Sequence, residues 1–132
     1  MMNDTVMLLL YGILAYIIGS IPSGLIIGKI FFNTDVRLYG SKNIGATNTY
    51  RVIGIKAALP VFLCDTAKGA IGVLLFSSVG PMYMILGGIL AMIGHNWSIF
   101  LGFKGGRGVA TGLGVLIALS PLVALICFTV WG

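Results

Sequence analysis

Four long apolar runs divide the chain, over residues 6–32, 57–79, 82–103 and 109–131. A helix needs about 20 residues to cross the hydrocarbon core of a bilayer, and each run is long enough. The runs lack the apolar–polar alternation that is typical of membrane β-strands. The pattern therefore predicts an all-α fold: a polytopic helical membrane protein with about four transmembrane helices, in a single integral membrane domain over residues 1–132.

The first run is longer than one crossing requires, and it contains Pro22 near its middle. Proline lacks a backbone N–H and disturbs the preceding helical turn, so we expect a kink at Pro22. Gly24 and Gly28 follow with the spacing of a small-xxx-small pair. This spacing favours close packing against another helix.

Composition supports the membrane assignment. Hydrophobic residues make up 58% of the chain and charged residues only 8%, whereas a soluble domain carries about 25% charged residues. The net charge of +5 lies in loops and near the ends of the apolar runs, which argues against a nucleic-acid partner. Cys64 and Cys127 lie inside apolar runs and match no metal-ligand spacing, so we interpret both as packing residues.

The basic residues predict the orientation in the membrane. Residues 33–56 contain four of them and residues 102–108 contain two, whereas the N-terminus before residue 6 has none. With four crossings both basic loops lie on one side of the membrane, and basic loops are typically cytoplasmic. We therefore expect two basic cytoplasmic loops and an N-terminus outside.

The first basic loop carries a dense group of polar residues over 40–51. Hydroxyl, amide and cationic side chains next to two glycines can donate many hydrogen bonds to an anion. The alternative is an ordinary hydrophilic connector, with helix caps at Ser41 or Thr47. The candidate binding residues are Ser41, Lys42, Asn43, Thr47, Asn48 and Arg51.

The second basic loop, residues 102–112, combines glycines and cations directly before the fourth apolar run. Free N–H groups and the helix dipole favour an anion at such a position. The alternative is a flexible, positively charged turn that only sets topology. The candidate phosphate-binding residues are Lys104, Gly105, Gly106, Arg107, Gly108 and Thr111.

The ionisable residues Asp65, Lys68 and His95 lie within the second and third apolar runs. Asp65 and Lys68 are three residues apart and share one helix face. Ionisable groups at membrane depth usually face the protein interior or a water-filled cavity. They form either a structural ion pair or part of a substrate site. His95 is either a structural residue or a base or hydrogen-bonding partner for phosphate.

Taken in order, these segments resemble the acyl-phosphate glycerol-3-phosphate acyltransferase family of the bacterial inner membrane. The resemblance extends over about residues 16–114. It rests on Gly19-Ser20-Ile21-Pro22-Ser23-Gly24, on Gly40-Ser41-Lys42-Asn43-Ile44-Gly45-Ala46-Thr47-Asn48 with Arg51 and Gly54, on Asp65-Thr66-Ala67-Lys68-Gly69, on Gly94-His95, and on Phe103-Lys104-Gly105-Gly106-Arg107-Gly108-Val109-Ala110-Thr111.

The resemblance implies a membrane enzyme of phospholipid synthesis that transfers a fatty acyl group from acyl phosphate to glycerol 3-phosphate. The products are lysophosphatidic acid and phosphate, and neither a cofactor nor a metal is expected. It implies catalytic roles for Ser41, Arg51 and Lys104. Residues 104–108 match the family's phosphate-binding loop, and Asp65, Lys68 and His95 remain further candidates.

The chain departs from the family pattern in two ways. Arg107 stands where the family more often has lysine, and the two cations differ in hydrogen-bond geometry. Family members are also roughly half as long again, and their third motif, with a histidine and an asparagine, would follow Gly132. The sequence therefore predicts a C-terminally short family member, with a separate polypeptide as a candidate partner supplying the remainder.

Other functions fit the same residues. The basic loops could serve a non-catalytic membrane protein that binds anionic lipid or phosphate, or an inactive shortened acyltransferase. A small transporter would place Asp65 and Lys68 on its path. For the enzyme, we expect Ser41 to orient the attacking hydroxyl or the donor phosphate. The less favoured mechanism makes Ser41 a nucleophile with His95 as its base.

Overall fold

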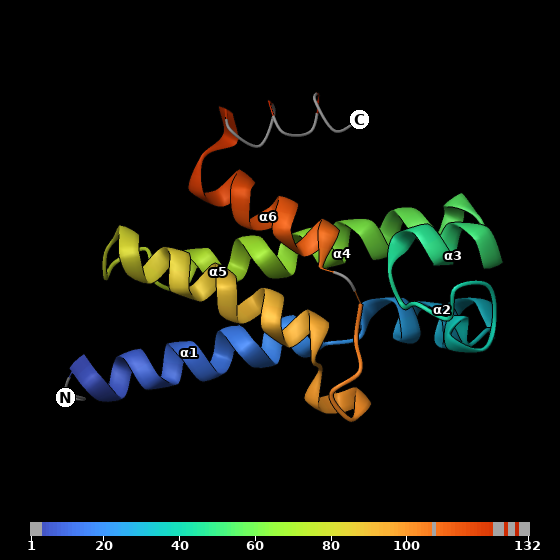
Figure 1. The fold of residues 1–132 in the computed structure, drawn as a ribbon, viewed down its shortest axis with the longest axis horizontal. Coiled ribbons are helices and arrows are strands. Elements are labelled where there is room, and N and C mark those ends of the chain that lie inside the picture. The colour runs from blue at the N-terminus through green and yellow to red at the C-terminus, as the bar shows by residue number, and fades with distance from the viewer. Residues whose placement is uncertain (1–3, 107, 123–125, 127–128, 130–132) are drawn as a thin grey trace.

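The computed structural model describes residues 4–106, 108–122, 126 and 129 (Figure 1). All regular secondary structure in these residues is helical, which confirms the all-α prediction. The elements are α1 (Asp4–Ser20), α2 (Ser23–Phe32), the 3-10 helix η1 (Val36–Leu38), α3 (Ala46–Val52), α4 (Ile55–Leu74), α5 (Pro81–Asn96), the 3-10 helix η2 (Ile99–Leu101) and α6 (Val109–Leu119).

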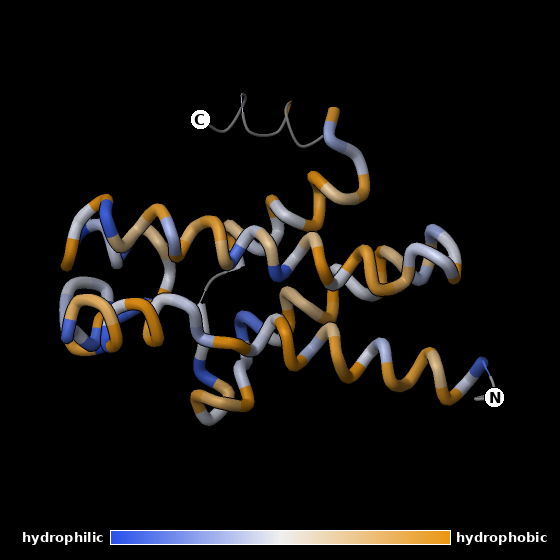
Figure 2. Tube along the Cα trace, turned by 180° about the vertical axis from the view of Figure 1, so that it is seen from behind, coloured by the Kyte–Doolittle hydropathy of each residue, from blue (hydrophilic) through white to orange (hydrophobic). Residues whose placement is uncertain are grey.

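Helix α4 lies at the centre of the arrangement. It packs against α1, α5 and α6, and α5 also packs along α1 (Figure 1). The short helices α2 and α3 gather at one end of α4, together with the loop that joins them. The long helices are mostly hydrophobic along their length, and hydrophilic residues concentrate in the region of α2 and α3 (Figure 2).

Among the described residues, two segments are long and apolar enough to cross a membrane alone, Ile55–Leu74 and Pro81–Leu101, and the bent pair of α1 and α2 makes a third if it counts as one span. The predicted number of about four crossings is not confirmed by these residues. Within the predicted crossing over 109–131, α6 is a helix of 11 residues, about 17 Å long. Pro121 lies just after the end of α6. Proline disfavours helical backbone at the residue before it, which accounts for the end of the helix at this point. Most of the later residues of this run lie outside the described part.

The break in the first run lies where the sequence predicted it. Helix α1 ends before Pro22 and α2 begins after it, and the two helices are bent by 43°. The interpretation of Gly24 and Gly28 needs correction. A Cβ at Gly24 would overlap the carbonyl of Ile44, and one at Gly28 would lie 2.7 Å from the carbonyl oxygen of Thr34. This face therefore packs against the loop after α2 instead of another helix.

The long helices approach one another at glycines. A Cβ at Gly94 of α5 would overlap the carbonyl of Tyr16 of α1, and a Cβ at Gly114 of α6 would overlap the carbonyl of Thr66 of α4. Lipid tails are as apolar as leucine, so membrane helices associate through close packing more than through hydrophobic burial. These glycines therefore hold the bundle together by leaving room for the facing backbone.

An ion-pair cluster folds the start of the loop after α2. Asp35 accepts hydrogen bonds from the backbone N–H of Arg37 at 3.0 Å and from its guanidinium Nη2 at 2.8 Å. The ammonium of Lys29 lies 3.7 Å from the same carboxylate. The hydrogen bonds from Arg37 lower the pKa of Asp35 from 3.8 to about 2. The cluster thereby connects the end of α2 to η1.

The glycine contacts lead to a stability prediction for the α1–α5 interface. Gly94→Ala should destabilise the protein by about 1–3 kcal/mol, because the added Cβ overlaps backbone that cannot move alone. Gly12→Ala is the matched control, since its Cβ would lie 3.4 Å from the side chain of Leu90, and it should be neutral or stabilising by up to about 1 kcal/mol. Thermal unfolding in detergent measures both, and equal unfolding temperatures would contradict the packing argument.

The Asp35 cluster leads to a prediction on pH. Its folded pKa of about 2 lies below the usual 3.8, so its contribution to stability is complete above about pH 4 and is lost as the pH falls toward 2. The contribution is at most about 1 kcal/mol, because the pair is partly exposed. Unfolding temperatures of Asp35→Asn and the parent should therefore differ above pH 4 and converge near pH 2.

Candidate active site

Both basic loops border one cavity of about 340 Å³. The first loop contributes its hydroxyl, amide and guanidinium groups, α4 and α5 contribute ionisable side chains, and the first turn of α6 closes the cavity. Eight of the predicted site residues line it: Ser41, Asn43, Thr47, Asn48, Arg51, Asp65, His95 and Gly108.

Six other predicted residues are described and do not line this cavity. Lys42 and Lys104 are exposed, Lys68 and Thr111 are buried, and Gly105 and Gly106 pack against the end of α5. Arg107 lies outside the described residues. The structure therefore brings most of the first motif and Gly108 of the second motif to the same cavity.

The first loop is organised around the buried side chain of Asn48. Its Nδ2 donates hydrogen bonds to the carbonyls of Val36, Tyr39 and Asn43, at 3.0, 3.2 and 2.8 Å. Its Oδ1 accepts a hydrogen bond from the backbone N–H of Ser41 at 3.0 Å. The amide of Asn48 thus replaces the backbone pairing that a loop lacks, and it fixes Ser41 at the cavity.

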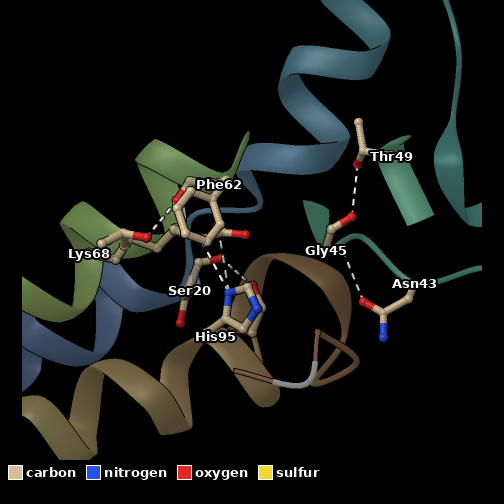
Figure 3. Close-up of polar contacts among 10 residues, drawn as sticks. Ser20, Asn43, Gly45, Thr49, Phe62, Lys68 and His95 are labelled. Atoms are coloured by element: carbon tan, nitrogen blue, oxygen red, sulfur yellow. Dashed lines mark hydrogen bonds and ion pairs between the residues drawn. The ribbon is translucent and has the colours of Figure 1, made fainter. Parts of the chain in front are cut away.

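Two local bonds shape the turn into α3. The N–H of Gly45 donates to Oδ1 of Asn43 at 2.9 Å, and the hydroxyl of Thr49 donates to the carbonyl of Gly45 at 2.9 Å (Figure 3). Gly40 has φ +58°, and a Cβ there would overlap the Asn48 side chain. Together these contacts orient α3 so that Arg51, in its last turn, reaches the cavity.

The second loop lies directly on the C-terminal end of α5. The N–H of Gly106 donates to the carbonyl of His95 at 3.0 Å, and a Cβ at Gly106 would overlap Nε2 of the His95 ring. Gly108 has φ +78°, and its Cβ would lie 2.7 Å from Oδ1 of Asn96. A side chain would not fit at Gly106 or Gly108, so both positions require glycine. Gly108 directs the first turn of α6 toward the cavity.

A cluster of buried ionisable side chains lies between α4 and α5. The ammonium of Lys68 lies 3.0 Å from Oδ1 of Asp65 and 3.4 Å from Nδ1 of His95, and all three side chains are at most 5% exposed. The structure therefore contains the predicted ion pair, and Asp65 also lines the cavity. Figure 3 shows the His95 ring reaching from α5 toward α4, which carries Phe62 and Lys68.

An apolar wall was not foreseen from the sequence. The apolar residues that line the cavity are Phe62, Ala46, Val109 and Ala110. Phe62 precedes Asp65 by three residues, so helical periodicity could have placed it on the same face. Among the described residues, no group of three or more His, Cys, Asp or Glu side chains could hold a metal ion. The cavity combines cationic, hydrogen-bonding and apolar surfaces, which suits an anion with an apolar part.

Comparison with known proteins agrees with these features. The glycerol-3-phosphate acyltransferase family profile matches residues 9–132. Glycerol-3-phosphate acyltransferase 2 of Moorella thermoacetica is 47% identical over 95% of this chain and 65% of its own length. The glycerol-3-phosphate acyltransferase of Listeria monocytogenes is 49% identical over 96% of this chain and 67% of its own length. The chain thus spans about two thirds of the length of these relatives.

Solved structures of PlsY (YgiH), an integral membrane glycerol 3-phosphate acyltransferase, have the same fold. The glycerol 3-phosphate form matches with a TM-score of 0.88 and 42% identity, over 94% of this chain and 63% of that one. The lysophosphatidic acid form matches with a TM-score of 0.84 and 41% identity, over 94% and 62%. With its apolar helices, the chain is a multi-pass membrane protein. The resemblance seen in the sequence is confirmed, and the chain belongs to the glycerol-3-phosphate acyltransferase family.

Proposed function

We propose that this protein transfers a fatty acyl group from acyl phosphate to glycerol 3-phosphate. The oxygen of the glycerol hydroxyl forms a new ester bond to the acyl carbon. The bond from that carbon to the phosphate oxygen breaks, and phosphate leaves with the electron pair. The products are lysophosphatidic acid and inorganic phosphate. The observation that carries the proposal is the single cavity in which Ser41, Arg51 and Gly108 meet an apolar wall.

The charge of the cavity suits these substrates. Each phosphate carries about −1.5 to −2 at neutral pH, so binding two of them requires cations and N–H donors. Arg51 lines the cavity, and its planar guanidinium can hold two phosphate oxygens at once. Lys104 is exposed in the adjoining loop, and the first-turn N–H groups of α6 favour an anion through the helix dipole. Together they would hold the phosphates and stabilise the charge of the leaving group.

The donor also has an apolar tail, and the cavity has a place for it. Phe62, Val109 and Ala110 give the cavity an apolar part of its lining. An acyl chain lying along this wall would place its carbonyl carbon between the wall and the polar residues. The reacting atoms would then be held close together, which is a large part of the rate enhancement in such a transfer.

Ser41 is assigned the role of orienting the reactants. Its backbone N–H is fixed by Asn48, and its side chain lines the cavity. An acyl phosphate already has a good leaving group, so direct attack by the glycerol hydroxyl needs no acyl-enzyme. The proton of that hydroxyl can pass to a substrate phosphate oxygen, whose second pKa lies near 6.

We also propose a bacterial membrane location, with both basic loops on the cytoplasmic side and the N-terminus outside. Support comes from the excess of Lys and Arg in these loops, and from the cavity that both loops border. We also propose a separate polypeptide as a further partner, which would supply the part of the family fold that lies outside the 65% of the Moorella relative matched by this chain.

The proposed function predicts product formation that depends on Arg51. The chain in lipid bilayers, given palmitoyl phosphate and labelled glycerol 3-phosphate, should form labelled lysophosphatidic acid. Arg51→Ala should lower the rate by about a hundredfold. Arg37→Ala is the matched control, because Arg37 pairs with Asp35 and does not line the cavity. It should stay within about threefold of the parent.

The assay is run with the chain alone and with the C-terminal remainder of the Moorella relative co-expressed as a separate polypeptide. Formation of lysophosphatidic acid in either arm, together with its loss in Arg51→Ala, supports the proposed acyltransferase activity. Tight phosphate binding without product in both arms would favour a non-catalytic binder of anionic lipid or phosphate.

The orienting role of Ser41 predicts that no acyl-enzyme forms. Acid quenching of the protein during turnover of labelled acyl phosphate should leave no label on the polypeptide. Ser41→Ala should reduce the rate by about ten- to a hundredfold, the range expected when one positioned hydrogen-bonding group is removed. A label that appears on the parent and is absent from Ser41→Ala would establish the nucleophilic mechanism instead.

A further inference from the structure

His95 is the one histidine of the chain, and the mechanism above gives it no task. It lies near the C-terminal end of α5, is 3% exposed and borders the cavity. Its two ring nitrogens face different surroundings. Nδ1 faces the ion pair on α4, and Nε2 faces the second loop. The chemistry open to His95 therefore depends on which nitrogen carries the proton.

The ion pair determines the position of the proton. Nδ1 of His95 lies 3.4 Å from Nζ of Lys68. An ammonium group has three donors and no lone pair, so this contact is favourable only if Nδ1 accepts. Nδ1 is also 3.8 Å from Oδ1 of Asp65, which is too long for a hydrogen bond. Since a neutral imidazole has one donor and one acceptor nitrogen, the proton belongs on Nε2.

The Nε2–H group then lies at the second loop, beside the cavity that His95 lines. A Cβ at Gly106 would overlap Nε2, which places this atom against the second loop. Within the described part of the chain, the side-chain hydrogen bond of His95 is the one between Nδ1 and Lys68, and none is found at Nε2. The cavity that His95 lines also contains Arg51, Ser41 and Gly108, and a phosphate oxygen there would be an acceptor.

We infer that His95 is a neutral imidazole that donates its Nε2–H to a phosphate oxygen of the substrate, with Asp65 and Lys68 fixing this tautomer. The inference rests on the proposed function for its substrate class, a phosphate monoester or acyl phosphate. Asp65 cancels the charge of Lys68, so the cluster adds a directed donor without a further net cation. With its Nδ1 lone pair facing Lys68 and a proton on Nε2, His95 has no free lone pair to serve as a base for Ser41.

The single histidine makes a direct test possible. The chain, produced with ¹⁵N-labelled histidine and a histidine-free tag, is placed in lipid nanodiscs, and ¹⁵N NMR shows which ring nitrogen carries the proton. We expect the Nε2–H tautomer at neutral pH. A dominant Nδ1–H tautomer or an imidazolium would overturn the inference. This measurement on the parent chain needs no variant to fold.

Two lysines of α4 provide a matched pair of variants. Lys68→Met removes the donor to Nδ1 and should shift the spectrum toward a mixture of tautomers. Lys56→Met lies on the same helix at an exposed position and should leave the spectrum of His95 unchanged. If folded Lys68→Met keeps the parent spectrum, Lys68 does not fix the tautomer and the inference fails.

Ligand titrations test the hydrogen bond to phosphate and its source. Inorganic phosphate, glycerol 3-phosphate and a non-hydrolysable acyl phosphonate are added separately, and the ligand that shifts the Nε2 signal identifies the phosphate that His95 contacts. His95→Phe should weaken binding of that ligand about ten- to a hundredfold, as expected for a hydrogen bond to a charged group. No shift with any of the three at saturation, or unchanged affinity in folded His95→Phe, would overturn the inference.

The outcome is separable from that of the proposed function. The tautomer and the phosphate titration are read without turnover. The predicted spectrum and ligand shifts, with no lysophosphatidic acid formed in either arm of the turnover assay, would refute the acyltransferase activity and support the role of His95. Formation of lysophosphatidic acid together with the Nδ1–H tautomer would support the acyltransferase activity and refute the inference about His95.

Discussion

Close approach of helix backbones at glycines is the constraint on which the site depends. Helix α4 contacts α5 and α6 with almost no side chain between the backbones. A Cβ at Gly69 of α4 would overlap the carbonyl of Thr111 of α6, and one at Gly87 of α5 would overlap the carbonyl of Gly72 of α4. Asp65 and Lys68 lie on this crowded helix and are nearly inaccessible. Buried charges are strongly unfavourable unless paired. The same packing therefore enforces the ion pair and fixes the surroundings of His95.

A second level of organisation lies outside the bundle, in the loop between α2 and α3. This loop has little backbone pairing of its own, and a single amide supplies the missing partners. Asn48 was predicted to bind phosphate, but its donors and its acceptor are engaged by the loop itself. Its effect on substrate would therefore act through the placement of Ser41 and Arg51. Polar residues in such a motif divide into those that meet substrate and those that hold the others in place.

The sequence predicted the helices, the break at Pro22 and the meeting of the basic loops, because each follows from local periodicity or charge placement. The contact between Gly106 and His95 joins residues that are distant by any local pattern, so only the folded chain reveals it. The same holds for the partner of Gly24, which is a loop carbonyl where a helix was expected. The apolar wall was missed because Phe62 looks like any lipid-facing residue until the cavity beside it is known.

Glycines in a loop are usually described as flexible, and the contacts of three glycines in the second loop imply the opposite for them. Gly105, Gly106 and Gly108 lie so close to His95 and Asn96 that any side chain would collide with them. Glycines held this tightly have little conformational freedom left to lose when an anion binds. The entropic cost of ordering, which commonly weakens binding to mobile loops, is then met when the protein folds. Phosphate would then bind to a preformed site at these glycines, with little induced fit.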